Sequence, residues 1–217
     1  MDENYYNLSY SGQEVHVGLN TTLTFGAQRI PFPHIKGLRY IPAFITEEEA
    51  TDLIDTIYSQ PWLSDLKRRV QHYGYKYDYT AKTISDDAYL GPLPDWLSAL
   101  SQRLHSEKIF ATLPDQVIIN EYLPGQGIAF HRDIVSCFGS VVASLTLGSA
   151  AIMRFRNVAT EEESEALLEE RSLVVMSDDA RYEWQHSIPA RKSDLVGGVE
   201  IPRGTRVSMT FRTVIRD

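Results

Sequence analysis

The chain has 217 residues, 43% of them hydrophobic and 23% charged, which are ordinary values for a soluble globular protein. No apolar run is long enough to span a bilayer, and the acidic N-terminus lacks the basic and apolar regions of a secretory signal. Cys137 is the single cysteine, which excludes an intrachain disulfide. We therefore expect a cytoplasmic, monomeric protein with no membrane partner.

The formal net charge of −8 is unusual for a nucleic-acid-binding domain, because such domains are more often basic. The charges are segregated, however. Glutamates gather at positions 47–49 and 161–170, whereas Lys67, Arg68 and Arg69 form one basic cluster and Arg154 with Arg156 forms a second. Local potential decides what a groove attracts, so a polynucleotide partner stays open.

Two helices are predicted in the first half of the chain, after an irregular segment 1–40 that is expected to form an arm or short edge strands. Residues 46–60 begin with capping-box spacing between Thr46 and Glu49 and end at Pro61. Apolar residues then recur at helical period: Ala50, Leu53, Ile54, Ile57 and Tyr58. A second helix is predicted over 94–106, with an inward face of Trp96, Leu97, Leu100 and Leu104.

From about residue 116 the chain consists of short segments rich in β-branched and aromatic residues, separated by turn signals such as Pro124-Gly125 and Gly197-Gly198. Such spacing indicates a sandwich or barrel. We predict a mainly β, α+β fold, a jelly roll (double-stranded β-helix) with two N-terminal helices packed on one face. One domain is expected, with an arm, helix and lid at 1–90 and the core at 91–217. The Glu-rich stretch 160–170 is predicted as either a charged hairpin loop or a short helix.

His131 and Asp133 have the i, i+2 spacing that places both side chains on one side of an extended strand, with Cα atoms roughly 6.6 Å apart. His186, on a later predicted strand, supplies a third ligand. Two imidazoles and one carboxylate form the facial set that leaves Fe(II) open positions for a co-substrate and O₂. We therefore expect catalytic iron ligands at His131, Asp133 and His186. The alternative is a hydrogen-bonded core histidine with Asp133 in a turn, because H-x-D also occurs by chance.

A strand near the C-terminus is predicted to alternate polar and apolar residues. One face carries Arg206, Ser208, Thr210 and Arg212, and the other carries Val207, Met209 and Phe211. A guanidinium binds a carboxylate bidentately and stays charged when partly buried, so the arginines, with the Ser208 hydroxyl between them, match the distal carboxylate of 2-oxoglutarate. Asn120 and Tyr122 share a face upstream of His131 and can hydrogen-bond the same co-substrate. The alternative for the arginine face is a solvated outer surface.

Taken together, these residues resemble the AlkB family of Fe(II)/2-oxoglutarate dioxygenases, over about residues 40–215. The matching motifs, in chain order, are N-x-Y at Asn120 and Tyr122, P-G before H-x-D at His131 and Asp133, His186 within Arg181-Tyr-Glu-Trp-Gln-His186-Ser-Ile, and R-x5-R at Arg206 and Arg212.

The resemblance implies a double-stranded β-helix with an N-terminal nucleotide-recognition lid. It implies iron at His131, Asp133 and His186, and 2-oxoglutarate at Asn120, Tyr122, Arg206 and Arg212. It also implies that O₂ and 2-oxoglutarate hydroxylate a C–H bond, and that an N-methyl group so hydroxylated leaves as formaldehyde. The expected activity is oxidative demethylation or hydroxylation of alkylated or modified bases in DNA or RNA.

Two local features bear on the substrate. Bacterial DNA-repair members of the family usually carry an acidic residue two positions after the iron aspartate, where this chain has Val135. Segment 68–77, and Trp184-Gln-His186 followed by Pro189-Ala-Arg-Lys-Ser-Asp, resemble the oxygenase domain of the animal enzyme that hydroxylates a modified wobble uridine in tRNA.

A basic and tyrosine-rich segment is predicted to contact the substrate. Lys67, Arg68 and Arg69 can hold phosphates, and tyrosines alternate after them at 73, 75, 77 and 79, as on a hairpin face that stacks on an unpaired or flipped base. We therefore expect Arg69, Tyr75 and Tyr77 to bind substrate, and Arg156 and Arg191 to widen the positive rim. The alternative is a tyrosine-rich strand that packs on the core.

Two other functions stay open at this point. A 2-oxoglutarate hydroxylase can act on a protein side chain or small metabolite, without salt-dependent binding of oligonucleotides. A non-catalytic jelly roll can bind nucleic acid through the tyrosine and basic patch.

Overall fold

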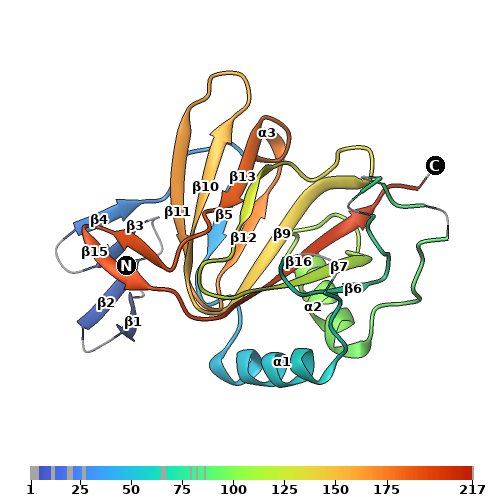
Figure 1. Ribbon diagram of the computed structural model, residues 1–217, viewed down its shortest axis with the longest axis horizontal. Coiled ribbons are helices and arrows are strands. Elements are labelled where there is room, and N and C mark those ends of the chain that lie inside the picture. Colours follow the sequence, from blue (N-terminus) through green and yellow to red (C-terminus); the bar gives the residue numbers. More distant parts are fainter. Residues whose placement is uncertain are drawn as a thin grey trace.

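The computed structural model describes residues 5–10, 13–18, 22–25, 28–64, 67–78, 80–81, 83–85 and 87–216, with side chains from residue 32 onward. Strands make up a larger share of the described chain than helices, and its helices are α1 (Glu47–Ser59), α2 (Asp95–Ser106) and the short α3 (Asp178–Tyr182) (Figure 1). No helix in these ranges is long and apolar enough to cross a membrane.

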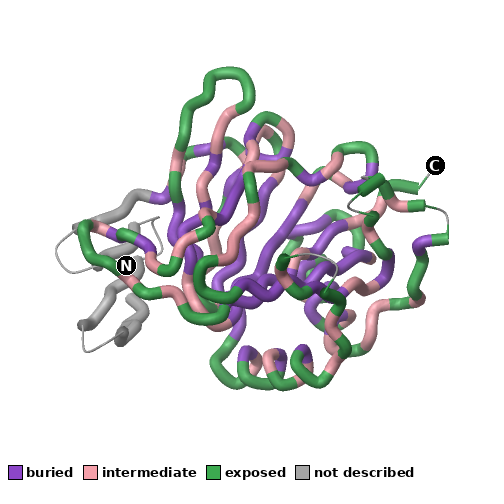
Figure 2. Tube along the Cα trace, viewed as in Figure 1, coloured by how far each residue is buried: buried purple, intermediate pink, exposed green. Residues whose placement is uncertain are grey.

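Two antiparallel sheets form the body of the molecule. The larger has six strands in the order β5 (Leu38–Ile41), β12 (Leu173–Met176), β9 (Phe138–Gly148), β16 (Arg206–Val214), β7 (Gln116–Tyr122) and β6 (Val70–Tyr73). The smaller has four in the order β11 (Glu163–Leu168), β10 (Ala151–Asn157), β13 (Trp184–Ile188) and β8 (Ile128–His131). The two sheets face each other as the predicted jelly roll, and burial is concentrated in their strands (Figure 2).

Further strands lie outside the two main sheets. A hairpin joins β14 (Ser193–Val196) and β15 (Val199–Pro202). The N-terminal strands form a four-stranded antiparallel sheet: β1 (Tyr5–Tyr10), β2 (Gln13–Gly18), β3 (Thr22–Phe25) and β4 (Gln28–Pro31). Of the strands in segment 1–40, β1–β4 therefore form a sheet of their own, whereas β5, which begins in this segment, is an edge strand as expected and pairs with β12 of the six-stranded sheet.

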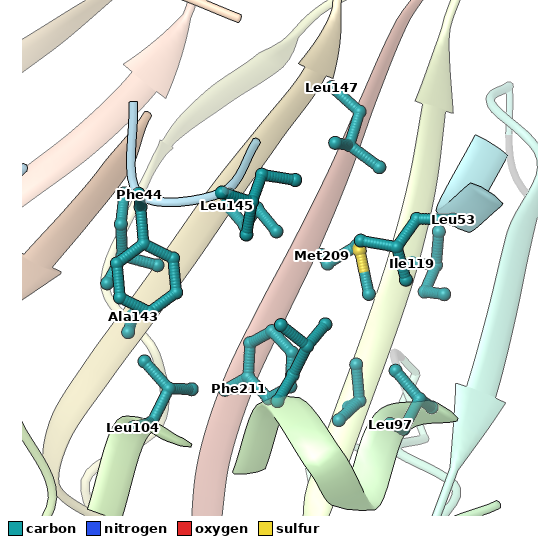
Figure 3. Packing of buried hydrophobic residues seen from close by; sticks show 14 of the residues in the cluster. Phe44, Leu53, Leu97, Leu104, Ile119, Ala143, Leu145, Leu147, Met209 and Phe211 are labelled. Carbon is teal, nitrogen blue, oxygen red and sulfur yellow. The ribbon is translucent and has the colours of Figure 1, made fainter. Parts of the chain in front are cut away.

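Helices α1 and α2 cover the outer face of the six-stranded sheet, as predicted. The Thr46 side chain accepts from the backbone N–H of Glu49 and the Glu49 carboxylate accepts from that of Thr46, a reciprocal cap that stabilises the helix by about 1 kcal/mol. The apolar helix faces pack on alternate sheet residues (Figure 3). Leu53, Leu97 and Leu104 of the helices, with Phe44 just before α1, face Ile119, Ala143, Leu145, Leu147, Met209 and Phe211 of the sheet. Because β16 alternates, burying Met209 and Phe211 under the helices turns its polar residues to the inner face.

The Glu-rich stretch forms a hairpin rather than a helix. Residues 158–162 make the exposed tip between β10 and β11, and Arg154 of β10 pairs with Glu163 and Glu165 of β11. Farther along β11, Ala166, Leu167 and Leu168 are buried. Of the two predicted forms, the charged hairpin is confirmed.

Candidate functional site

Three candidate metal ligands meet between β8 and β13. His131, the last residue of β8, lies opposite His186 of β13 in the antiparallel pair. Asp133 lies in the loop after β8, not in the extended strand predicted for both residues. The ligand atoms of the three residues lie within 4.8 Å of one another, and His186 Nε2 is 3.8 Å from Asp133 Oδ2. This convergence matches the set of two imidazoles and one carboxylate that suits Fe(II).

Both histidines are held in forms that suit metal binding. His131 Nδ1 lies 2.9 Å from the carbonyl oxygen of Ala129. A carbonyl oxygen only accepts, so Nδ1 is the donor in this contact and Nε2 is the ring nitrogen that is left for a metal. Burial, with the neighbouring His131, lowers the pKa of His186 to about 3. The His186 imidazole is therefore neutral at pH 7, as a metal ligand must be.

Asp133 is kept ionised by an arginine from the facing sheet. Arg212 Nη2 lies 2.5 Å from Asp133 Oδ1, and the two side chains are 9% and 7% exposed. Burial by itself raises the pKa of Asp133, but Arg212 and then His186 outweigh it and hold that pKa well below its usual range. The Gln116 side chain accepts a hydrogen bond from Arg212 Nη1, which fixes the guanidinium. Asp133 is thus an anion at neutral pH with Oδ2 directed toward His186.

Arg206 on β16 is a buried cation without an anionic partner. It is 4% exposed, and its Nη2 donates to Thr146 Oγ1 at 2.9 Å while its Nε has no hydrogen-bond partner. No carboxylate among the described residues pairs with it. Burial lowers the pKa of Arg206 to about 10, so the guanidinium is still charged at neutral pH. A buried charge with unsatisfied donors is costly, and the carboxylate of a small anion such as 2-oxoglutarate fits it.

One cavity of about 600 Å³ between the two sheets contains all of these groups. The inner face of β7 contributes Asn120 and Tyr122, and the Arg206 guanidinium carbon is 5.7 Å from the centre of the Tyr122 ring. Every predicted iron and co-substrate residue lines the cavity: Asn120, Tyr122, His131, Asp133, His186, Arg206, Ser208 and Arg212.

Comparison with known proteins agrees with this geometry. The family model described as the 2OG-Fe(II) oxygenase superfamily matches residues 37–212. The chain belongs to this superfamily. "Uncharacterized protein L905" of Acanthamoeba polyphaga mimivirus is 36% identical over 189 residues, covering 85% of this chain and 88% of that protein. The likeness therefore extends over nearly the whole catalytic body.

Two further likenesses show that this oxygenase is AlkB-like. "tRNA (carboxymethyluridine(34)-5-O)-methyltransferase ALKBH8" of Mus musculus is 34% identical over 234 residues, covering 94% of this chain but only 34% of that protein. The solved structure "The structure of OsALKBH1" superposes with a TM-score of 0.61 at 18% identity, covering 82% of this chain and 96% of that one. The second match shows the shared fold, and the chain spans about a third of the mouse relative.

Of the three residues predicted to bind substrate, Tyr77 lines the oxygenase cavity, where its ring lies 5.7 Å from that of Phe138. Arg69 and Tyr75 do not line it. Arg69 forms a bidentate ion pair with Glu121 at 2.8 and 2.6 Å, on the helix side of β7. Tyr75 is buried against Tyr89, with ring centroids 5.0 Å apart, in a separate hollow.

The tyrosines therefore do not present one face. Tyr73 packs edge-on against Trp96 in the core, Tyr75 lies in the second hollow, and Tyr77 reaches the cavity, while Tyr79 lies outside the described residues. For Tyr73 the alternative of core packing applies. The chain turns at Gly74, whose φ of +74° is in the left-handed region, and this breaks the strand alternation on which the prediction relied.

Arg68, predicted together with Lys67 and Arg69 to hold phosphates but not among the three expected substrate-binding residues, lines the cavity. Its Nε donates to Asn120 Oδ1 at 2.8 Å, and its guanidinium carbon is 5.7 Å from the centre of the Tyr122 ring. Arg68 and Arg69 reach opposite faces of β7, because Asn120 and Glu121 point to opposite sides of that strand. The buried Glu121 needs a cation and binds Arg69 on the helix side of β7, while Arg68 reaches the cavity side. Arg191 is likewise committed elsewhere, to Asp194 at 2.7 Å.

Proposed function

We propose that the chain is an Fe(II)/2-oxoglutarate dioxygenase that oxidises a modified nucleobase. The observation that carries the proposal is a single cavity in which three metal ligands lie beside an unpaired, buried guanidinium. His131, Asp133 and His186 would hold Fe(II). Iron so bound supplies O₂ activation, coupling the conversion of 2-oxoglutarate to succinate and CO₂ with hydroxylation of a C–H bond.

Each remaining polar group of the cavity receives a role from its contacts. Arg206, with Thr146 bound to its Nη2, would hold the distal carboxylate of 2-oxoglutarate. Asn120, Tyr122 and Ser208 line the same space and would donate further hydrogen bonds to the co-substrate. Arg212 keeps Asp133 ionised and oriented by its 2.5 Å ion pair. The ion pair leaves Oδ2 for the metal.

The aromatic lining of the cavity supports a planar substrate. Tyr77 and Phe130 line it, and the guanidinium carbon of Arg156 lies 4.3 Å from the centre of the Phe130 ring. Aromatic faces and guanidinium planes stack on bases, and a base presented this way has left its duplex or is single-stranded. The printed name of the mouse relative refers to tRNA, which supports a nucleic-acid substrate. Arg68, which also lines a neighbouring groove, is the residue we assign to the strand's phosphates.

The charge of the cavity favours a neutral or anionic modified base. Asp133 is the single carboxylate among the described lining residues, and it is already paired, whereas Arg68, Arg132, Arg206 and Arg212 are cations. The charges of Fe(II) and the 2-oxoglutarate dianion cancel. A cationic base would thus enter a site with surplus positive charge, and desolvating it there is unfavourable.

Two oligonucleotides that differ mainly in base charge test the proposal. The protein is loaded with Fe(II) without O₂, then given O₂, 2-oxoglutarate and DNA or RNA that carries 3-methyluracil, which is neutral, or 3-methylcytosine, which is cationic. We expect succinate and formaldehyde to form faster with the neutral base, and Asp133→Ala to give neither. Equal background succinate with every oligonucleotide, but turnover of a protein or metabolite, would replace the nucleobase by that substrate.

A further inference from the structure

The loop that carries Asp133 is held by an arginine from the segment that carries His186. Helix α3 ends at Tyr182 and β13 begins at Trp184, so Arg181 lies five residues before His186. Arg181 is buried, at 3% exposed. A buried guanidinium needs partners for its five N–H groups, and here the partners lie on the other ligand-bearing segment.

All four hydrogen bonds of the Arg181 guanidinium go to backbone carbonyl oxygens of residues 133–139. Nη1 donates to Asp133 O at 2.7 Å, Nη2 donates to Phe138 O at 3.2 Å and more weakly to Ile134 O at 3.5 Å, and Nε donates to Gly139 O at 3.2 Å. Residues 132–137 belong to no strand, so no sheet ladder fixes this loop. The Arg181 guanidinium therefore holds the backbone of this loop in place, and its shortest hydrogen bond is to the carbonyl oxygen of Asp133.

A second arginine ties the same two segments in the opposite direction. Arg132, between the ligands His131 and Asp133, donates through Nη1 to the carbonyl oxygen of Tyr182, the residue next to Arg181. Each segment therefore sends one guanidinium to the backbone of the other. These hydrogen bonds join the two segments that carry Asp133 and His186, whose atoms Oδ2 and Nε2 lie 3.8 Å apart.

We propose that Arg181 is a positioning residue for the metal centre: through the Asp133 carbonyl and the 133–139 loop it sets the separation of Asp133 from His186, with Arg132 as the weaker reciprocal tie. This inference rests on the proposed function, because it presupposes that the three ligands bind a metal. Mutation of a residue that orients a metal ligand without itself binding the metal typically weakens metal affinity 10–100-fold.

Metal affinity is the test, because it needs neither substrate nor turnover. Mn(II), a redox-stable substitute for Fe(II), is titrated by electron paramagnetic resonance into wild type, Arg181→Gln and Arg181→Lys, at a temperature where circular dichroism shows each folded. We expect Arg181→Gln to weaken Mn(II) binding about 10–100-fold. Arg181→Lys should recover only part of the lost affinity. The lysine ammonium can still donate to these carbonyl oxygens, but as a compact group it reaches fewer than four of them.

A matched control separates positioning from simple stability. The Arg203 side chain is also buried, at 6% exposed, and hydrogen-bonded, through Asp194 and the Pro189 carbonyl oxygen, but it does not line the metal cavity. Arg203→Gln should lower the unfolding midpoint and leave the Mn(II) dissociation constant within about threefold, whereas Arg181→Gln should move both. Equal affinity for wild type and Arg181→Gln, or an equal loss in Arg203→Gln, would overturn the inference.

Arg132→Gln keeps the test decisive if Arg181→Gln does not fold. Arg132 is exposed, and Arg132→Gln removes one hydrogen bond, the one to the Tyr182 carbonyl oxygen. The fold should therefore tolerate this substitution. We expect Arg132→Gln to weaken Mn(II) binding several-fold with an unchanged unfolding midpoint, and unchanged affinity would contradict the two-way tie. Wild-type protein that binds no Mn(II) would instead refute the proposed function itself.

Discussion

Two buried aspartates, Asp133 and Asp194, are both bound by arginine, yet their surroundings differ. Asp194 accepts from Arg203 at 2.5 and 2.7 Å, from Arg191 at 2.7 Å and from the Ile152 backbone N–H at 3.1 Å. Asp133 has one ion pair, at 2.5 Å to Arg212, and its second oxygen faces His186 at 3.8 Å. The first carboxylate is saturated, while the second keeps lone pairs for a metal.

The arginines differ in the same way. Arg203 uses Nε, Nη1 and Nη2 on Asp194 and the Pro189 carbonyl oxygen. Arg206 is as deeply buried but uses only Nη2, on Thr146, and its Nε has no partner. Buried polar groups are almost always satisfied, so an unsatisfied guanidinium that lines a cavity is a candidate position for a bound anion. Burial and ion pairing alone would not distinguish the structural cluster from the candidate active site.

The largest effect is expected from Asp133→Ala. Altering residues that only orient a metal ligand costs 10–100-fold, so removing a direct ligand should lower succinate formation by more than about 100-fold. Binding of single-stranded oligonucleotide, measured by fluorescence anisotropy, should persist because Arg68 and Tyr77 are untouched. Loss of binding to the same extent would show that the change had unfolded the protein.

Asp194→Ala should affect stability instead. The change leaves the Arg203 guanidinium buried without its counter-ion, and breaking a buried pair in this way costs about 3–5 kcal/mol of the free energy of unfolding. Urea denaturation followed by circular dichroism measures the loss. Mn(II) affinity of the folded fraction should stay at the wild-type value, and a metal affinity that falls with stability would abolish the distinction between the clusters.

The sequence predicted those features that depend on local periodicity. Capping-box spacing located α1, and strand alternation placed Arg206, Ser208 and Arg212 on the face opposite Met209 and Phe211. The predicted convergence of the three metal ligands is also found. His131 and Asp133 are only two residues apart, and His186 reaches them because β13 pairs with β8. Period-two reasoning works where one face of a strand must be buried.

Features that depend on loops and long-range pairing could not be predicted. Asp133 lies beyond the end of β8, and the turn at Gly74 sends successive tyrosines to different parts of the molecule. Which of two adjacent arginines enters the cavity was decided by Glu121 on the far side of β7. Such pairings join residues more than fifty positions apart, and no local pattern encodes the partner.

Arg206→Met should weaken 2-oxoglutarate binding and, at the same time, raise the stability of the metal-free protein. Replacing a buried, unpaired guanidinium with an apolar chain of similar length removes a desolvation cost, so we expect the metal-free protein to gain about 1 kcal/mol in free energy of unfolding. Loss of charge-assisted bonds, about 1.5–3 kcal/mol, should weaken 2-oxoglutarate binding about 10–100-fold in calorimetry with Mn(II). Arg203→Met, the matched change in the saturated cluster, should instead destabilise the protein and leave 2-oxoglutarate binding intact.

The smallest effect concerns mild acid, where the two clusters should separate again. The pKa of His186 is lowered to about 3 by burial, whereas an unfolded histidine titrates near 6.5. Between these two pH values the unfolded state binds a proton at His186 that the folded state does not. The free energy of unfolding of the metal-free protein should therefore decrease as the pH is lowered, by about 1 kcal/mol per pH unit below 6.5. The pKa of Asp194 is lowered despite its burial, by Arg203 and the Ile152 N–H, so its contribution is lost only below about pH 4. Urea denaturation in a chelator at pH 7 and pH 5 should therefore show a decline that His186→Gln flattens and Asp194→Asn does not, and an unchanged slope in His186→Gln would mean that His186 is already protonated in the folded protein.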